Sequence, residues 1–262
     1  MAGPGTSADA IAAPEALLRI EGVVKRFGGF TALDGIDLVV RPGERLGLIG
    51  PNGSGKSTLV NCIAGTLRND AGRIHFGGVD LSRTATYRRV RMGIARSFQI
   101  PRPFASMSVI DNLRVPLLYA ANHRAGDVAG VMAMDSARAG EEGMAILAQV
   151  GLAAKADAMA GGLTQVDMRK LELARAMAAR PRLLISDEAM AGLSTAEVDE
   201  ILALLMGLKE RGVAVIMIEH VMRAVMRFSD RIAVLVAGHK IADGDPQSVA
   251  ANPEVVSAYL GQ

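Results

Sequence analysis

A glycine-rich turn follows an apolar run in the first quarter of the chain. Residues 46–49 read Leu-Gly-Leu-Ile, and the next nine are Gly50, Pro51, Asn52, Gly53, Ser54, Gly55, Lys56, Ser57 and Thr58. Glycines at three of these positions let backbone amides approach an anion without interference from a Cβ atom. The lysine can reach the β- and γ-phosphates of a nucleotide, the serine hydroxyl can bind Mg²⁺, and the following helix directs its positive end at the anion. Strand, turn and helix in this order predict a loop that binds ATP or GTP.

The composition favours an aliphatic core. The chain has 262 residues, of which 50% are hydrophobic and 3% aromatic, and it has no tryptophan. This length is enough for one large domain, or for a domain with a subdomain, with a substantial core. Aliphatic residues are typical of strands buried on both faces of a parallel sheet. The formal net charge of +2 indicates no electrostatic footprint for nucleic acid, so we expect no nucleic-acid partner.

The sequence indicates neither a secretory signal nor a membrane-spanning helix. No basic residue precedes Arg19, and the strongest apolar runs are Val213–Ile218 and Ile232–Ala237. These runs are far shorter than the ~20 residues that span a bilayer. Residues 1–16 are rich in alanine, glycine and proline, and we expect them to form a flexible N-terminal tail. If the protein works at a membrane, a partner must hold it there.

The single cysteine and an arginine-rich stretch each have an expected structural role. The single cysteine, Cys62, falls in the helix expected after the loop, where a small buried hydrophobe is the ordinary role. One cysteine cannot form a disulfide within the chain. The stretch Arg88-Arg89-Val90-Arg91 is expected to be a solvated helix face, with a phosphate or partner contact as the alternative.

Strand patterns alternate with helical patterns along the chain. The expected strands include Leu18–Val24, Ile36–Val40, Arg45–Ile49, Gly72–Phe76, Ile94–Phe98, Leu183–Ser186, Val213–Ile218 and Arg231–Val236. This alternation predicts an α/β fold in which helices cover the faces of a mainly parallel sheet. The helix-rich stretch of about residues 100–178 is long enough to be a subdomain inserted into that sheet.

Acidic and imidazole side chains follow two of the expected strands. Asp187 and Glu188 end the run that begins at Leu183, and His220 ends the run that begins at Val213. Open α/β sheets place their ligand sites at the carboxyl ends of their strands. There, Asp187 would hold Mg²⁺ through water, and Glu188 would orient or deprotonate the attacking water. His220 could hydrogen-bond the γ-phosphate.

Taken in order, these motifs resemble the nucleotide-binding subunits of ABC transporters over about residues 17–262. The resemblance also rests on Phe27, on Gln99 after Arg96-Ser97-Phe98, on the helix Met168–Met177 and on Ala191–Ser194. The resemblance implies a P-loop NTPase fold (ABC ATPase) with a mainly parallel core sheet, an N-terminal antiparallel β part and an inserted helical subdomain. It implies ATP and Mg²⁺ as cofactors, with Phe27 stacked on adenine and Gln99 bound to Mg²⁺. Glu188, His220 and Gln99 are the expected catalytic residues.

Within this family, the chain most resembles the larger ATPase of branched-chain amino acid importers. This closer resemblance rests on Lys25–Gly29, Ala191–Leu193, Ile218–His220 and the ending Ala258-Tyr259-Leu260-Gly261. ATPases of urea importers and of a lipopolysaccharide exporter are close relatives, so these systems remain as alternatives. Solute selectivity lies in the permease and in a separate binding protein.

One segment departs from the family pattern. The register of Arg169–Met177 places Leu163-Thr164-Gln165-Val166-Asp167 where the family has its signature, Leu-Ser-Gly-Gly-Gln or Leu-Ser-Tyr-Gly-Gln. Val166 replaces a glycine that approaches the γ-phosphate, and would add about 1–2 kcal/mol of strain if that glycine has a positive φ. Asp167 adds a negative charge near an anion. In addition, Ala189 replaces a proline, and Ser194 replaces an acid or amide and is expected to cap a helix.

The family geometry gives this departure a consequence. ATP is held between the phosphate loop of one subunit and the signature of the other, so the altered segment would damage the opposite site. We therefore expect a heterodimer with a second ABC ATPase subunit, in preference to a homodimer. The expected further partners are an integral membrane permease and, indirectly, a periplasmic or extracellular solute-binding protein. The expected location is peripheral, on the cytoplasmic face of the inner (plasma) membrane.

Three other classes of protein are alternatives to the transport ATPase. ABC proteins of DNA repair or translation carry paired cassettes or long coiled coils, and this chain has neither. A GTPase or kinase that shares only the phosphate loop is disfavoured because no Asn-Lys-x-Asp guanine reader occurs. A partly degenerate regulatory half of a transporter stays open because of residues 163–167.

Overall fold

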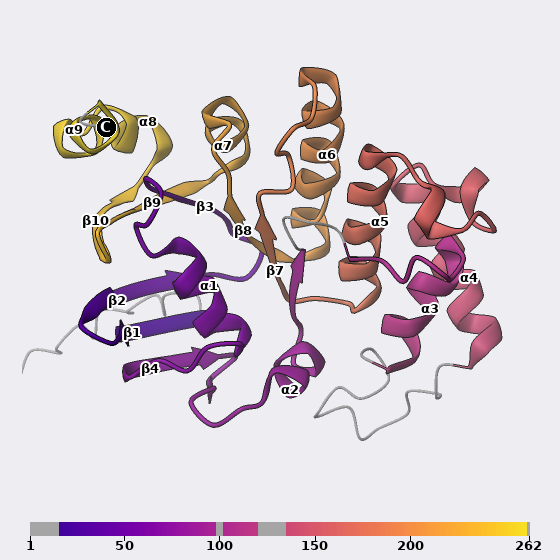
Figure 1. Ribbon diagram of the computed structural model, residues 1–262, viewed down its shortest axis with the longest axis horizontal. Helices are drawn as coiled ribbons and strands as arrows, with labels where there is room; N and C mark the ends of the chain where they lie inside the picture. The colour runs from indigo at the N-terminus through magenta and orange to yellow at the C-terminus, as the bar shows by residue number, and fades with distance from the viewer. Residues whose placement is uncertain (1–15, 98–101, 120–134, 261–262) are drawn as a thin grey trace, which may run out of the picture.

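The computed structural model describes residues 16–97, 102–119 and 135–260. Within these residues, two sheets form the body of the protein (Figure 1). A six-stranded sheet has the order β10-β9-β3-β8-β7-β6, and a four-stranded sheet has the order β2-β1-β4-β5. The strands are β1 (Leu18–Phe27), β2 (Phe30–Val40), β3 (Arg45–Ile49), β4 (Ala71–Phe76), β5 (Val79–Asp80), β6 (Ile94–Ser97), β7 (Leu183–Asp187), β8 (Ala214–Ile218), β9 (Arg231–Val236) and β10 (His239–Gly244).

The larger sheet is parallel apart from its edge strand. Strand β3 pairs in parallel with β8 and β9, and β7 pairs in parallel with β8 and β6. Only β10 runs antiparallel, against β9, whereas every pairing in the four-stranded sheet is antiparallel. The predicted fold class, a mainly parallel core sheet with an N-terminal antiparallel part, is confirmed.

Helices cover the parallel sheet and extend it at one end. The helices are α1 (Lys56–Ala64), α2 (Thr86–Arg91), α3 (Val109–Tyr119), α4 (Ser136–Gln149), α5 (Gln165–Ala178), α6 (Thr195–Gly207), α7 (Met222–Phe228), α8 (Pro246–Ala250) and α9 (Pro253–Leu260). Short 3₁₀ turns lie at η2 (Ala153–Lys155), η3 (Ala160–Gly162) and η4 (Lys209–Arg211). Figure 1 shows α3, α4 and α5 together at one end, and α8 and α9 at the opposite end.

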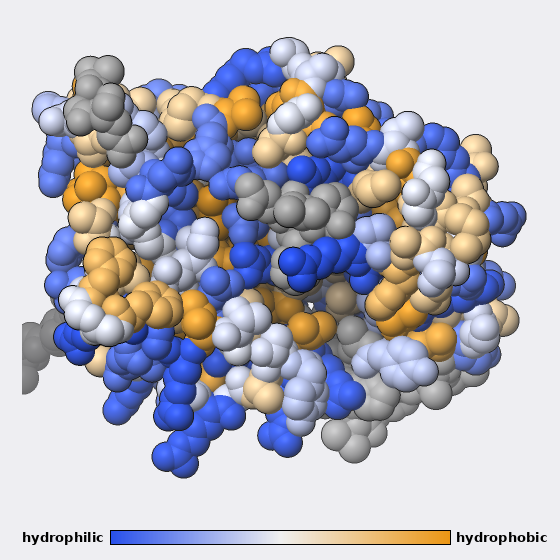
Figure 2. All heavy atoms as spheres, in the orientation of Figure 1, coloured by the Kyte–Doolittle hydropathy of each residue, from blue (hydrophilic) through white to orange (hydrophobic). Residues whose placement is uncertain are grey.

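The α3–α5 group has a hydrophobic core of its own. Val109, Leu113, Leu147 and Leu171 are completely buried in a cluster separate from those around the sheet. Ser108 directly precedes α3, and its hydroxyl accepts a hydrogen bond from the Asp111 amide and donates one to the Asp111 carboxylate. On the face shown in Figure 2, hydrophobic side chains gather over this helical end and over the outer end of the β1–β2 hairpin.

The expectation of a solvated arginine face on α2 is wrong for Arg89. This side chain is 6% exposed, and its guanidinium donates to the carbonyls of Cys62, Ile63, Leu81 and Thr84 at 2.7–2.9 Å. The last carbonyls of a helix lack partners within the helix, and a guanidinium offers five N–H donors in a fixed plane. Arg89 therefore joins the end of α1 to the 81–84 turn. Cys62 is buried as predicted, and burial raises the pKa of its thiol to about 11.

Candidate nucleotide site

The glycine-rich loop joins β3 to α1, and two of its glycines have no room for a side chain. Gly50 has a φ of 148°, and a Cβ atom there would lie 2.0 Å from the Leu235 carbonyl oxygen. Gly55 has a φ of 104°, and its Cβ would lie 2.6 Å from the Ala32 carbonyl oxygen. Positive φ and close backbone approach are both conditions that glycine meets without strain. The loop conformation therefore depends on glycine at these two positions.

Lys56 lies folded into the loop. Its ammonium donates to the carbonyl oxygens of Gly50 at 2.7 Å and Pro51 at 2.9 Å. The residue is 7% exposed, and burial lowers its pKa, although the charges of Glu188 and Asp187 act in the opposite direction. Lys56 therefore lies close enough to Glu188 and Asp187 for their charges to interact.

Glu188 and His220 meet at the carboxyl ends of neighbouring strands. The pairing of β7 with β8 brings Asp187 opposite Ile218, and the residues that follow form a contact of 2.8 Å between Glu188 Oε1 and His220 Nε2. Glu188 has a φ of 49°, which a glutamate rarely adopts, and its amide donates to the Ile218 carbonyl at 2.9 Å. Left-handed backbone at a non-glycine residue is often found in functional sites. The geometry points the carboxylate at the imidazole.

A pocket of about 260 Å³ brings together most of the predicted site residues. It is lined by Phe27, Phe30, Ala32, Glu188 and residues 52–58. Phe27 and Phe30 are paired across the β1–β2 turn and are 47% and 61% exposed. Two exposed aromatic rings beside a phosphate loop offer a surface on which a base can stack. Sequence reasoning named Phe27 and missed Phe30, which no motif distinguishes from an ordinary turn residue.

The residues present fit a Mg²⁺ ion that is shared with a nucleotide. Asp187 is 6% exposed and ends β7, and Ser57 is exposed at the start of α1. Among the described residues, no group of three or more His, Cys, Asp or Glu side chains could hold a metal alone. Mg²⁺ usually takes one or two protein oxygen ligands, with phosphates and water completing its shell. Gln99, the other predicted ligand, lies outside the described residues.

Glu219 was not predicted as a site residue, although it lies between β8 and His220. It is 3% exposed, and its carboxylate accepts a hydrogen bond of 2.9 Å from the Met190 amide. Burial raises its pKa to about 7, and the charge of Glu188 acts in the same direction. Its position directly before His220 is the only signal in the sequence, because burial depends on the segments packed around it.

The segment at the family-signature position forms the start of α5. Thr164 is the N-cap of α5, and its hydroxyl accepts from the Asp167 amide at 3.2 Å and donates to the Asp167 carboxylate at 2.8 Å. Lys155 donates to the same carboxylate at 2.5 Å. Burial alone would raise the pKa of Asp167, but the hydrogen bonds from Lys155 and Thr164 lower it. The negative charge that Asp167 adds is therefore paired within the chain.

The conditional strain at Val166 does not arise. This residue lies inside α5, and it is not among the described residues that have a positive φ. The difference between Val166 and the family's glycine is therefore the size of the side chain, not backbone strain. Ser194 caps α6 as predicted, in a capping box with Glu197.

A phosphate loop, a buried acid at the end of one strand and a histidine after the next strand are typical of a P-loop nucleoside triphosphatase. Comparison with known proteins narrows this class. Residues 33–191 match the family described as ABC transporter, and residues 239–262 match the branched-chain amino acid ATP-binding cassette transporter family. The chain belongs to the ABC transporter family, as an ATP-binding subunit.

Two relatives in bacteria match almost the whole chain. The high-affinity branched-chain amino acid transport ATP-binding protein BraF of Pseudomonas aeruginosa is 38% identical over 255 residues, covering 94% of this chain and 98% of BraF. The corresponding protein LivG of Escherichia coli is 37% identical over 257 residues, with 94% and 98% covered.

Two solved structures share the fold. A nucleotide-free ATP-binding cassette from an ABC transporter has a TM-score of 0.82 and 32% identity, and covers 95% of this chain and 100% of its own. The ADP conformation of an ATP-binding cassette has the same TM-score, identity and coverage.

Proposed function

We propose that this protein binds and hydrolyses ATP to power an ABC importer for branched-chain or related amino acids. The observation that carries the proposal is the pocket in which the phosphate loop, Phe27 and Glu188 lie together, with His220 against the carboxylate. The relatives BraF and LivG, which are named for branched-chain amino acid transport, support the choice of solute.

Different residues of the site bind the phosphates, bind the base and activate the attacking water. The loop amides and Lys56 bind the phosphates, and the aromatic pair at Phe27 and Phe30 holds the base. Glu188 orients or deprotonates the attacking water, and His220 holds the carboxylate and faces the γ-phosphate. Mg²⁺ held by Ser57, Gln99 and Asp187 would neutralise charge on the phosphate oxygens.

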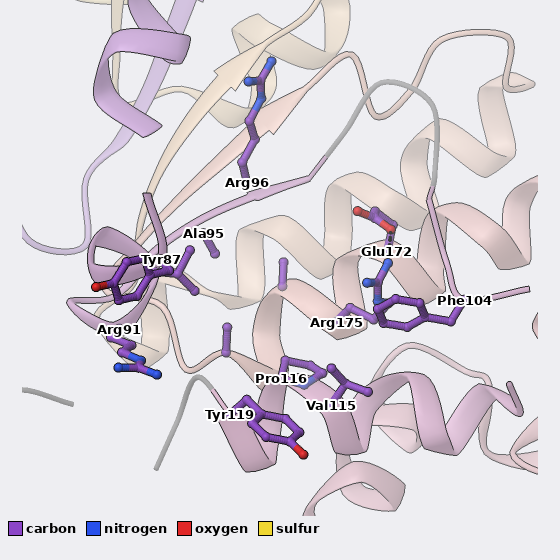
Figure 3. A pocket seen from close by; sticks show the side chains of 13 residues that line it. Tyr87, Arg91, Ala95, Arg96, Phe104, Val115, Pro116, Tyr119, Glu172 and Arg175 are labelled. Atoms are coloured by element: carbon purple, nitrogen blue, oxygen red, sulfur yellow. Dashed lines mark hydrogen bonds and ion pairs between the residues drawn. The ribbon is translucent and has the colours of Figure 1, made fainter. Parts of the chain in front are cut away.

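A groove between the sheet and the helical end suits the permease. Its volume is about 460 Å³, and Figure 3 shows side chains from α2, β6, α3 and α5 around it. Exposed aromatic residues line it, namely Tyr87 (56% exposed), Phe104 (44%) and Tyr119 (68%), together with Arg91, Arg175 and Glu172. Arg175 lies over the Phe104 ring at 5.0 Å. An amphipathic helix inserts its apolar side chains into grooves of this kind.

Replacing Tyr119 with glutamate should weaken binding of the permease by roughly 10-fold or more, because exposed aromatic side chains often dominate interface energies. ATPase stimulation by permease in nanodiscs measures this. Met144→Glu is the matched control, since Met144 is 40% exposed on α4 and does not line the groove. Equal stimulation of Tyr119→Glu and wild type would place the permease elsewhere.

No described helix is long and apolar enough to cross a membrane. Peripheral attachment to the cytoplasmic face of the inner membrane through the permease accounts for a transport role. Urea uptake, or export of lipid or lipopolysaccharide, is the alternative for the solute, and a separate binding protein would deliver the solute of an importer.

We further propose a heterodimer with a second ABC ATPase. Val166 is partly exposed at the start of α5, where the family signature has a glycine that faces the partner's nucleotide. Together with a partner ATPase, this chain would form one competent ATP site and one weakened site. A regulatory half without hydrolysis is the alternative that residues 163–167 leave open.

The chain alone should hydrolyse ATP roughly 10-fold more slowly than with its partner ATPase, because a blocked signature removes contacts to the transferred phosphate. Val166→Gly combined with Asp167→Gln should recover part of the rate of the chain alone. Phosphate release by the purified proteins measures both. Fast hydrolysis by the chain alone, unchanged by the double substitution, would indicate a competent homodimer.

A further inference from the structure

Arg96 joins three elements of the nucleotide site. It lies on β6, and its Nη2 donates to Asp187 Oδ2 at the end of β7 at 2.6 Å. Its Nη1 donates to Asn61 Oδ1 on α1, also at 2.6 Å. The Arg96 and Asp187 side chains are 17% and 9% exposed. One guanidinium therefore connects the strand before Gln99, the acid strand and the helix of the phosphate loop.

This ion pair restrains the carboxylate. An unpaired carboxylate at such low exposure is costly, and a planar guanidinium holds its partners in a fixed geometry. The bond to Asn61 fixes the guanidinium from the other side. Arg96 binds Oδ2 of Asp187. Lysine could supply the charge but not two directed bonds from one plane.

The same side chain also lines the groove between the sheet and the helical end. In Figure 3, the Arg96 side chain extends away from the groove, and its guanidinium points away from Tyr119, Pro116 and Phe104. Its stem thus lies at the groove, whereas its head group lies at Asp187. A segment bound in the groove would touch a side chain that itself holds the carboxylate of the nucleotide site.

We propose that Arg96 is a positioning residue that fixes Asp187 and links it to the groove. The inference rests on the proposed function, which assigns Mg²⁺ to Asp187 and a permease to the groove. It adds that the Arg96 side chain directly connects the groove to Asp187. A permease segment in the groove that moves the aliphatic part of Arg96 would change the position of the Asp187 carboxylate. This effect would add to the predicted role of Gln99.

The first arm of the test uses the isolated chain and no hydrolysis. Binding of the fluorescent analogue mant-ATP is titrated with Mg²⁺. Arg96→Met should raise the Mg²⁺ concentration for half-saturation roughly 10-fold, because Asp187 loses its restraint. Arg96→Lys should raise it roughly 3-fold, since the charge is kept and the second bond is lost. Binding without Mg²⁺ should stay unchanged.

Arg91→Met is the matched control, because Arg91 lines the same groove but lies over the Tyr87 ring, whereas the ion pair to Asp187 comes from Arg96. It should keep the wild-type Mg²⁺ requirement. A wild-type requirement in folded Arg96→Met would overturn the proposal, and so would an equal rise in Arg91→Met. If Arg96→Met does not fold, a wild-type requirement in Arg96→Lys overturns it instead.

The second arm adds permease in nanodiscs. Permease should shift the Mg²⁺ requirement of the wild type, and the shift should be lost in Arg96→Met. An equal shift in the variant would overturn the link to the groove. If the wild type does not bind permease at all, the proposed function fails, whereas the first arm still decides the role of Arg96 at Asp187.

Discussion

Replacing Glu188 with glutamine is expected to lower the rate of ATP hydrolysis by about 10²-fold or more, because general acid–base help is typically worth 10²–10⁴-fold. The amide keeps the size of the side chain and can still accept a hydrogen bond at the 2.8 Å contact with His220. It cannot take a proton from water. ATP binding should therefore persist, since the loop and Lys56 are untouched. Phosphate release and mant-ATP binding measure the two effects separately.

The control for this variant is Glu210→Gln, at an exposed residue of η4 that lies outside the pocket. It should hydrolyse ATP at the wild-type rate. Unimpaired hydrolysis by Glu188→Gln would remove Glu188 from the catalytic role. Loss of ATP binding in the same variant would show instead that the carboxylate supports the loop, for example through its charge on Lys56.

Replacing Glu219 with glutamine is expected to change how stability depends on pH. Burial raises the pKa of Glu219 from 4.5 to about 7 in the folded protein. Between these values, the folded state keeps a proton that the unfolded state has lost, so the free energy of unfolding falls as pH rises from 4.5 to 7. The fall should amount to about 3 kcal/mol, at about 1.4 kcal/mol per pKa unit, and should level off above pH 7.

The variant should lose this part of the pH dependence. Glutamine can accept the hydrogen bond from the Met190 amide as the carboxylate does. Above pH 7 it should therefore be more stable than the wild type by up to about 3 kcal/mol. Urea unfolding between pH 5 and 8.5 measures the difference. Glu210→Gln should stay within about 0.5 kcal/mol of the wild type, as exposed substitutions usually do. Parallel curves for Glu219→Gln and wild type would contradict the raised pKa.

Local sequence pattern was enough to place the strands that carry the site. The bounds predicted for Arg45–Ile49 and Arg231–Val236 are those of β3 and β9. Both strands are short, aliphatic and bounded by turn residues, so the pattern alone identifies them. Because parallel strands end at one edge of the sheet, the sequence also indicated that Glu188 and His220 belong to one site, although not that they contact each other.

Side-chain partners distant in the chain could not be predicted in this way. Arg89 lies in an arginine-rich run that reads as solvated, yet it bonds to carbonyls of α1 that lie 26 and 27 residues away. Arg96 and Asp187 are 91 residues apart, and only the pairing of β6 with β7 brings them together. The pairing of Asp167 with Lys155 depends in the same way on the turn that precedes α5.

The proposed transport function is tested most directly by uptake of labelled leucine into proteoliposomes. These contain the permease, the partner ATPase and this chain, with solute-binding protein outside and MgATP inside. We expect ATP-dependent uptake that unlabelled isoleucine and valine inhibit and urea does not. Vesicles with Glu188→Gln in place of the wild-type chain should show roughly 10²-fold slower uptake. Uptake at the same rate with and without ATP, or with Glu188→Gln, would contradict the claim that this site powers import.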